Sequence, residues 1–363
     1  MIKKGIYIHI PFCATKCPYC DFFSMRGNEE KKDSYLDALN KEIETAENIV
    51  ADTIYLGGGT PSVFGKERLK KLIIKAKEKF HFTDGEITVE VNPSSCDEDL
   101  IKVLTSVGVN RISMGLQSAV DDERKFLGRH SSCEKIRSDI KLCKKYGIEN
   151  ISLDVMLGVP QQTYESLEKT LSFVVDCDVK HVSTYILKIE ENTLFHRRQN
   201  ELPLPDEDTV CDMYEAVGNY LEKSGFHQYE ISNFSKPGYE SKHNLKYWNC
   251  EEYLGLGPAA HSFLNGKRFY HTRNFDDYLK KPSSYISDGD GGNFEEFAML
   301  KLRLTEGISR KEVSEKFYEE NFENLLKKSQ KFVDIKLMKS DENSLHFTKK
   351  GFLLSNTILS EII

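Results

Sequence analysis

Three cysteines near the start of the chain have the spacing of a metal site. Cys13, Cys17 and Cys20 directly follow a short apolar segment that is predicted to be a strand. Thiolates bind zinc and also hold iron–sulfur clusters. A structural zinc site usually takes four protein ligands, and no second cysteine or histidine pair lies nearby. Three thiolates therefore favour a [4Fe–4S] cluster with one iron open to a small ligand, while zinc remains the alternative.

The remaining cysteines are scattered singly and fall mostly in predicted helices, where ordinary buried thiols are common. They are Cys96, Cys133, Cys143, Cys177, Cys211 and Cys250. The chain has 363 residues and a net charge of −7, which disfavours a mainly nucleic-acid-binding surface. No apolar run approaches the roughly 20 residues that cross a bilayer, and no signal peptide is recognisable. These features predict a cytoplasmic protein whose grouped cysteines bind a metal.

The cysteines must be positioned by an alternation of strands and helices. Apolar runs predict strands at 5–10, 53–56, 86–91, 111–115, 151–157 and 181–186. Amphipathic segments predict helices at 33–50, 66–80, 97–106, 133–146, 164–175 and 207–223. Six β–α units in sequence predict an α/β fold with a parallel sheet. Because a closed barrel needs eight units, we expect an open (β/α)6 partial TIM-type barrel.

The predicted strands are unusually polar on one side. In the first, Ile6 and Ile8 alternate with Tyr7, and in the third, Val89 alternates with Glu90. Asp154 similarly interrupts the fifth strand. Side chains alternate faces along a strand, so the apolar set is expected under the helices and the polar set inside the barrel. This pattern predicts a lumen that holds a polar ligand.

The pattern changes after the sixth unit. We expect the barrel to occupy residues 1–232, a connecting segment 233–289, and a small C-terminal module 290–363. A glycine-rich stretch at 288–292 is predicted to be the linker. The module's helical segments and two short apolar runs predict a winged-helix-like α+β arrangement. From Asp290 onward, 13 acidic residues balance 12 basic ones, so packing against the barrel or a partner is favoured over DNA binding.

Two motifs at the predicted strand ends resemble the radical S-adenosylmethionine (SAM) superfamily. They are CxxxCxxC at Cys13–Cys20 and the segment Tyr55–Pro61, which reads YLGGGTP. The resemblance implies a partial barrel whose cluster binds SAM and cleaves it to a 5′-deoxyadenosyl radical. It extends over nearly the whole chain for one group of the superfamily, the HemN/HemW group. That group contains oxygen-independent coproporphyrinogen III dehydrogenases and haem chaperones.

The group's SAM-contacting positions match residues of this chain one by one. The resemblance assigns this role to Tyr7, Gly58, Gly59, Thr60, Glu90, Gln117, Arg129 and Asp154. Several of these are inward-facing residues of the predicted strands. Two alternatives remain: the glycines form a tight turn without a ligand, and the two carboxylates belong to a structural ion pair inside the barrel.

Details of the motifs favour the chaperone branch. The dehydrogenases carry a further cysteine, CxxxCxxCxC, whereas Asp21 follows Cys20 here. They also have an N-terminal extension, and only twelve residues precede Cys13. The segment His243–Trp248 resembles the HNxxYW motif of the chaperones, which makes His243 the expected haem ligand, although a structural histidine–aromatic cluster is the alternative. His261 and His271 are candidate second ligands.

The resemblance therefore implies a protein that binds haem, a [4Fe–4S] cluster and SAM, and that delivers haem to haem-dependent, respiratory proteins. The alternatives are coproporphyrinogen III dehydrogenation in porphyrin biosynthesis and another radical SAM reaction. Any turnover would be SAM-dependent oxidoreductase chemistry on a porphyrinogen. The expected partners are haem-acceptor proteins and an electron donor, without nucleic acid. The sequence is compatible with peripheral membrane association and with a homodimer.

Overall fold

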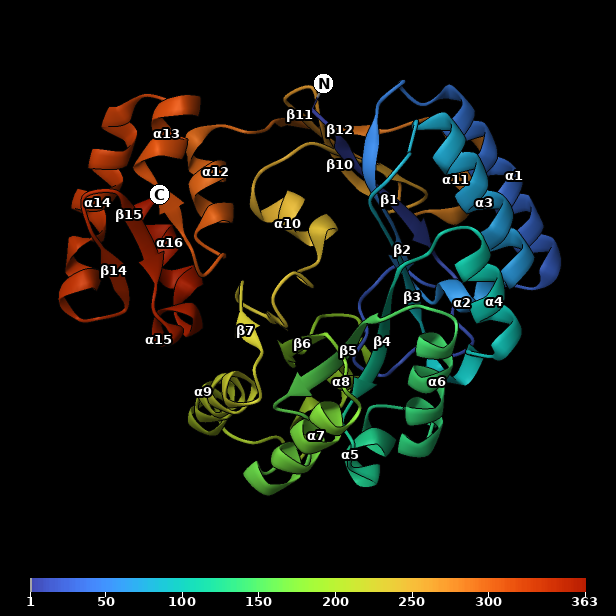
Figure 1. Cartoon of the computed structure of the whole chain (residues 1–363), viewed down its shortest axis with the longest axis horizontal. Helices are drawn as coiled ribbons and strands as arrows, with labels where there is room; N and C mark the ends of the chain where they lie inside the picture. The colour runs from blue at the N-terminus through green and yellow to red at the C-terminus, as the bar shows by residue number, and fades with distance from the viewer. Residues whose placement is uncertain (1) are drawn as a thin grey trace.

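The computed structural model describes residues 2–363 and contains six parallel strands that pair in the order of the chain. They are β1 (Lys4–Ile10), β2 (Ala51–Gly58), β3 (Glu86–Val91), β4 (Arg111–Gln117), β5 (Asn150–Leu157) and β6 (His181–Ile186). Figure 1 shows them as one curved sheet with helices on its outer side. The predicted α/β architecture, an open barrel of six units, is confirmed.

The helices that follow the strands begin and end close to the predicted residues, with one exception. The main ones are α1 (Glu29–Thr45), α3 (Lys66–Lys79), α4 (Glu98–Ser106), α6 (Cys133–Lys145), α7 (Tyr164–Asp176) and α9 (Glu207–Lys223). Shorter ones are α2 (Pro61–Phe64), α5 (Asp121–Phe126), α8 (Leu194–Arg197), η1 (Pro93–Ser95) and η2 (Gln199–Glu201). The range 33–50 was wrong for α1, because the Asn28 side chain accepts from the Lys31 amide and starts this helix earlier.

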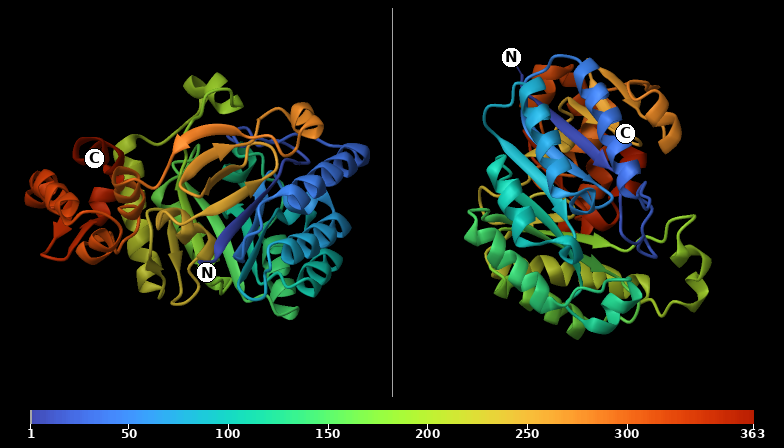
Figure 2. Two further views of the ribbon diagram at one scale, coloured as in Figure 1. Left: turned by 90° about the horizontal axis from the view of Figure 1, so that it is seen from above. Right: turned by 90° about the vertical axis from the view of Figure 1, so that its right-hand side faces the viewer.

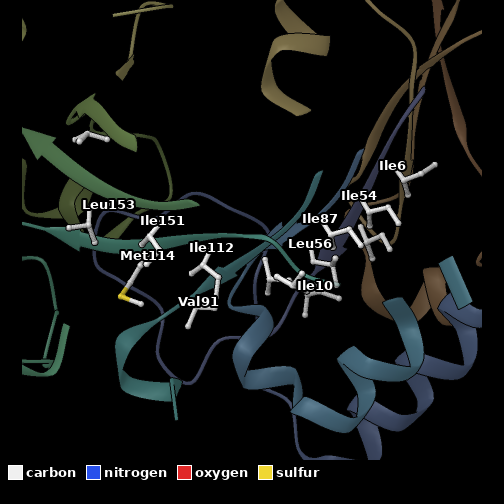
Figure 3. Packing of buried hydrophobic residues seen from close by; sticks show 14 of the residues in the cluster. Ile6, Ile10, Ile54, Leu56, Ile87, Val91, Ile112, Met114, Ile151 and Leu153 are labelled. Atoms are coloured by element: carbon white, nitrogen blue, oxygen red, sulfur yellow. The ribbon is translucent and has the colours of Figure 1, made fainter. Parts of the chain in front are cut away.

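The two faces of the sheet separate apolar from polar side chains as the alternation predicted. Ile6, Ile8 and Ile10 are 0% exposed, whereas Tyr7 between them is half-buried on the other face. Figure 3 shows the isoleucines of β1, β2 and β3 on the side of the sheet that carries the blue helices. Burial of these apolar side chains contributes about 1.5–3 kcal/mol for each. The inner face is thereby left to polar residues.

The segment 233–289 extends the sheet at both ends. It supplies β8 (Asn233–Ser235), α10 (Lys242–Trp248), β9 (Tyr253–Leu256), β10 (His261–Leu264), β11 (Lys267–Tyr270), α11 (Phe275–Lys280) and most of β12 (Ile286–Asp290). The order in the sheet is β12-β11-β10-β9-β1-β2-β3-β4-β5-β6-β8-β7, where β7 is His227–Gln228. In Figure 2, the orange strands lie beside the N-terminal strand.

The predicted linker at 288–292 was partly wrong. Residues up to Asp290 pair with β11 through Lys267 and form the edge strand β12. The exposed, glycine-containing sequence of this strand carries little β signal, and its pairing partner alone orders it. The division into 1–232, 233–289 and 290–363 stays a prediction.

The C-terminal module is a small α+β unit at one side of the barrel (Figure 1). It contains α12 (Phe294–Lys301), β13 (Ile308–Ser309), α13 (Arg310–Lys316), α14 (Glu319–Asp334), β14 (Met338–Ser340), β15 (Ser344–Phe347), α15 (Lys349–Leu353) and α16 (Ser355–Ile362). Its three strands form a separate antiparallel sheet with β15 in the centre. Lys349 forms an ion pair with Glu222 of α9, so the module packs on the barrel as expected.

Within residues 2–363, no helix combines the length and the apolar character needed to cross a bilayer.

Candidate functional site

The three cysteines lie in an irregular loop that leaves the carboxyl end of β1. The Cys13 amide donates to the Met25 carbonyl at 2.9 Å, and the Cys20 amide donates to the Cys17 carbonyl at 3.1 Å. All three thiols are half-buried. Burial raises the pKa of the Cys20 thiol, and the neighbouring Cys17 and Cys13 raise it further. The three thiols therefore lie near one another in this loop.

The donor set at this loop fits an iron–sulfur cluster. No three His, Cys, Asp or Glu side chains within residues 2–363 are arranged as a ready-made site for a single metal ion. The loop from Cys13 to Cys20 contains no helix or strand, so it can adjust around a larger cluster without breaking a regular element. The other six cysteines are also unpaired, and none of them lies in this loop. If a [4Fe–4S] cluster is bound here, the three thiolates would leave one of its irons without a protein thiolate.

The glycine loop at the end of β2 lies directly against the cysteine loop. The Gly59 amide donates to the Ile10 carbonyl at 2.8 Å, and the Thr60 amide donates to the Phe12 carbonyl at 2.7 Å. The Thr60 hydroxyl lies 3.4 Å from the Cys13 sulfur. A Cβ on Gly59 would lie only 2.8 Å from the Ile10 and Phe12 carbonyls. Glycine at this position therefore lets the two loops meet.

Two carboxylates point from β3 and β5 into the barrel. Glu90 accepts from the Tyr55 hydroxyl at 2.7 Å and from the Gly58 amide at 3.1 Å, and Asp154 accepts from the Ser113 hydroxyl at 3.2 Å. Burial raises the pKa of Glu90 to about 7, and nearby Asp154 adds to this shift. Burial likewise raises the pKa of Asp154 to about 6.

Neither carboxylate has an ion-pair partner within 4.0 Å among residues 2–363, although Arg111 and Arg129 lie near enough to lower the pKa of Asp154. A buried carboxylate without a paired cation is costly unless a ligand or hydrogen bonds compensate. This geometry favours a ligand-binding role over the alternative of a structural ion pair.

Gln117 and Arg129 complete the wall around these carboxylates. Gln117 has a φ of 68° at an irregularity of the β4–β5 register, and such bulges redirect side chains at strand ends. The Arg129 guanidinium donates to the Tyr19 hydroxyl at 2.7 Å, while its buried Nε has no partner within residues 2–363. A cavity of about 80 Å³ lies here, lined among others by Cys17, Thr60 and Arg129. The structure therefore places two of the predicted SAM-contacting residues, Thr60 and Arg129, in one cavity with Cys17, whereas the two carboxylates and Gln117 are not among the residues that line it.

The raised pKa of Glu90 predicts a pH-dependent stability for the protein without SAM. A carboxyl whose folded pKa lies above its unfolded value stabilises the fold at low pH, and this contribution is lost as the pH rises through about 7. When the pH is raised from about 5 to about 8, we expect the free energy of unfolding of the parent to fall by roughly 1–3 kcal/mol more than that of Glu90→Gln. Denaturant unfolding of the apoprotein at both pH values measures the difference.

Glu98→Gln provides the matched control for this prediction. A hydrogen bond from Tyr146, followed by one from Lys145, lowers the pKa of Glu98 to about 2, so this carboxylate stays ionised across the tested range. The stability of the Glu98→Gln variant should therefore change with pH as that of the parent does. An unchanged pH dependence in Glu90→Gln would contradict the assigned environment of Glu90.

His243, the predicted haem ligand, is enclosed rather than open. It is 1% exposed, its Nδ1 lies 2.8 Å from the Thr53 hydroxyl, and its Nε2 lies 2.7 Å from the Tyr247 hydroxyl. Its ring stacks on Tyr55 with centroids 5.2 Å apart. Burial lowers the pKa of His243 to about 3, so the ring is neutral. With both ring nitrogens engaged, this geometry corresponds to the alternative of a histidine–aromatic cluster.

Three residues of this region to which the sequence assigned no role, His9, Tyr55 and Tyr19, hold the predicted SAM-contacting side chains in place. His9 bonds the Tyr7 hydroxyl through Nδ1 at 3.0 Å and the Phe23 carbonyl through Nε2 at 2.9 Å, which fixes Tyr7 beside the glycine loop. Tyr55 holds Glu90, and Tyr19 holds Arg129. The period-two pattern of β1 already placed His9 inside the barrel, but it carried no information about these partners.

Family models match two parts of the chain. The radical SAM superfamily model covers residues 7–174, which include the cysteine loop and the strands that carry Glu90 and Asp154. The model of the HemN C-terminal domain covers residues 294–354, which form most of the small α+β module.

Curated relatives match the whole length of the chain. The haem chaperone HemW of Lactococcus lactis is 35% identical, with 100% of this chain and 98% of the relative covered. HemW of Bacillus subtilis is 36% identical over 99% of both chains, and HemW of Escherichia coli is 35% identical over 85% of this chain and 84% of its own. Among solved structures, the coproporphyrinogen III oxidase HemN of Escherichia coli shares the fold, with a TM-score of 0.85 and 22% identity. That alignment covers 99% of this chain and 90% of HemN.

Proposed function

We propose, for a chain that belongs to the HemW family of the radical SAM superfamily, that it is a haem chaperone. The observation that carries this proposal is the identity of 35–36% with proteins named haem chaperone HemW over essentially the full length of both chains. Both the barrel and the C-terminal module are included in that similarity. The fold alone does not separate this function from that of HemN, because HemN shares it.

The family implies a [4Fe–4S] cluster and SAM, and we propose Cys13, Cys17 and Cys20 as the cluster ligands. When bound, a reduced cluster supplies the electron that cleaves SAM to a 5′-deoxyadenosyl radical. Cys13, Cys17 and Cys20 would hold the cluster and leave one of its irons available to SAM. Because the Gly58 and Gly59 amides already donate within the protein, their carbonyls are the backbone groups proposed to accept from the amino group of SAM.

The remaining SAM contacts are proposed from the polar inner face. Asp154 can accept hydrogen bonds from ribose hydroxyls, and Arg129 offers a positive charge near the predicted SAM carboxylate. Glu90, Gln117, Thr60 and Tyr7 would enclose the rest of the molecule. Their burial excludes water from the reacting bond, which is the protein's share of such cofactor chemistry.

Haem-requiring proteins, respiratory ones among them, are the proposed recipients, and an electron donor would reduce the cluster. A cytoplasmic location, contact with the membrane surface and a homodimer belong to the same proposal. The raised pKa values of Glu90 and Asp154 support a site built for a polar ligand rather than for a solvated barrel end.

Anaerobic haem titration tests the proposed function. We expect the reconstituted full-length protein to bind about one haem per chain with a shifted Soret band. It should pass this haem to a haem-free acceptor protein faster than the haem dissociates from the protein into buffer. The same preparation, given coproporphyrinogen III, SAM and a reductant, should form no protoporphyrinogen IX. Turnover of the porphyrinogen without haem transfer would instead establish the dehydrogenase alternative.

A further inference from the structure

A second cavity, of about 340 Å³, opens beside the cysteine loop on the β9–β10 side of the barrel. It is lined by Tyr7, His9, Phe22, Tyr247, Tyr253, His261 and Arg273 among others. We propose that haem binds in this cavity, with His261 as its axial ligand and Arg273 paired with a propionate. This inference rests on the proposed function, and it assigns the haem ligand to a residue other than His243.

Of the two histidines that line the cavity, only His261 is free to bind iron. His9 has both ring nitrogens engaged, by the Tyr7 hydroxyl and the Phe23 carbonyl. The exposed His261 side chain makes no hydrogen bond with any of residues 2–363, and its ring is held by stacking on Tyr270 with centroids 5.0 Å apart. Partial burial lowers the pKa of His261, which favours the neutral imidazole that metals bind.

His271, the other histidine named as a candidate second ligand, is excluded by its contacts. Its Nδ1 lies 2.9 Å from the Ser284 carbonyl, and its Nε2 lies 2.8 Å from the Glu42 carboxylate. The side chain is 4% exposed. Binding of iron by His271 would require breaking a buried ion pair, whereas binding by His261 would break no hydrogen bond or ion pair.

The walls of the cavity are suited to a flat apolar macrocycle. Phe22, two residues after Cys20, is 70% exposed, and Tyr247 packs edge-on against Tyr253 with centroids 4.5 Å apart. Aromatic faces provide rigid apolar contact for a planar ring. Large pockets for small molecules combine such walls with a few polar groups, as this one does with His261 and Arg273.

Arg273 supplies the charge that haem's propionates need. Its guanidinium donates to the Asp21 backbone carbonyl at 3.2 Å, but it forms no ion pair with a carboxylate of residues 2–363. Arg268, by contrast, is already paired with Glu296. An exposed guanidinium without a carboxylate partner is available for a bidentate contact with a propionate.

The same geometry gives His243 a positioning role. Its Nε2 holds the Tyr247 hydroxyl, and Tyr247 forms part of the cavity wall. Loss of His243 would therefore loosen the wall without removing the iron ligand. Tyr7 also lines the cavity, so the proposed haem and SAM sites share a wall.

Haem titration of variants tests this assignment with a spectroscopic readout. In the anaerobically reconstituted full-length protein, we expect His261→Ala to bind ferric haem at least tenfold more weakly and to lose the histidine-ligated resonance Raman and EPR signature. Added imidazole should restore that signature. His243→Ala should weaken binding while keeping the histidine-ligated signature, and Arg273→Gln should weaken binding with an unchanged spectrum.

His81→Asn is the matched control, because His81 is an exposed histidine outside the cavity and asparagine tolerates its φ of 46°. It should bind haem as the parent does. Iron content and circular dichroism of every variant show that the cluster and the fold persist. Parent-like haem binding and spectrum in His261→Ala would overturn the assignment while the proposed function stands. Absence of haem binding in the parent protein would overturn the proposed function itself.

Discussion

Replacing Cys17 by alanine is expected to leave the protein folded but without its iron–sulfur cluster. Cys17 is the central thiol of the loop and lines the cavity that also contains Thr60 and Arg129. With two thiolates left, a [4Fe–4S] cluster lacks the ligands that hold it. Chemical iron and sulfide analysis after anaerobic reconstitution should fall from about four iron atoms per chain to fewer than about one.

The same substitution should hardly change the stability of the apoprotein. The loop contains no helix or strand, and the Cys17 thiol makes no hydrogen bond with any of residues 2–363. We therefore expect a change within about 0.5 kcal/mol in denaturant unfolding. Cys211→Ala is the control, since this half-buried thiol lies in α9 outside the cysteine loop, and its iron content should equal that of the parent. Zinc in place of iron in anoxic parent protein would contradict the cluster assignment.

The succession of six strand–helix units predicted the barrel, and the alternation of side chains along the strands predicted its inner face. In β1, the spacing of Ile6, Ile8 and Ile10 fixed both the strand and the face on which Tyr7 lies. Glu90 and Asp154 followed from the same period of two, because a strand places every second residue on one face. The cysteine loop was recognisable because its three cysteines lie within one short segment.

Long-range pairing explains what the sequence did not reveal. β9 pairs in parallel with β1, although Gly5 and Tyr253 are far apart along the chain, and a four-residue strand carries little pattern of its own. The partners of His243 pose the same problem, because Thr53 lies 190 residues away from it. The HNxxYW motif drew attention to His243, but only the fold shows that both of its ring nitrogens are engaged. The freedom of His261 likewise depends on residues that are distant in sequence.

Gly58→Ala is expected to abolish tight SAM binding, because the added methyl group would collide with a fixed side chain. Gly58 has a φ of 105°, and a Cβ at this position would meet the His9 imidazole ring. That ring is held by the Tyr7 hydroxyl and the Phe23 carbonyl, so it can move only by breaking two hydrogen bonds. Displacing it would also shift Tyr7 and the Gly58 amide that bonds Glu90. We expect SAM to bind at least about tenfold more weakly and the apoprotein to lose about 2–4 kcal/mol.

Gly147→Ala is the control that distinguishes the effect of the collision with His9 from the effect of backbone strain. Gly147 has a φ of 87°, but a Cβ there would meet nothing within 4 Å. This variant should lose about 1–2 kcal/mol from the left-handed backbone conformation alone. Its SAM affinity, measured by equilibrium dialysis with the reconstituted protein, should equal that of the parent. Equal SAM affinity in Gly58→Ala and Gly147→Ala would show that the ring of His9 yields, and that the glycine loop does not depend on this close approach.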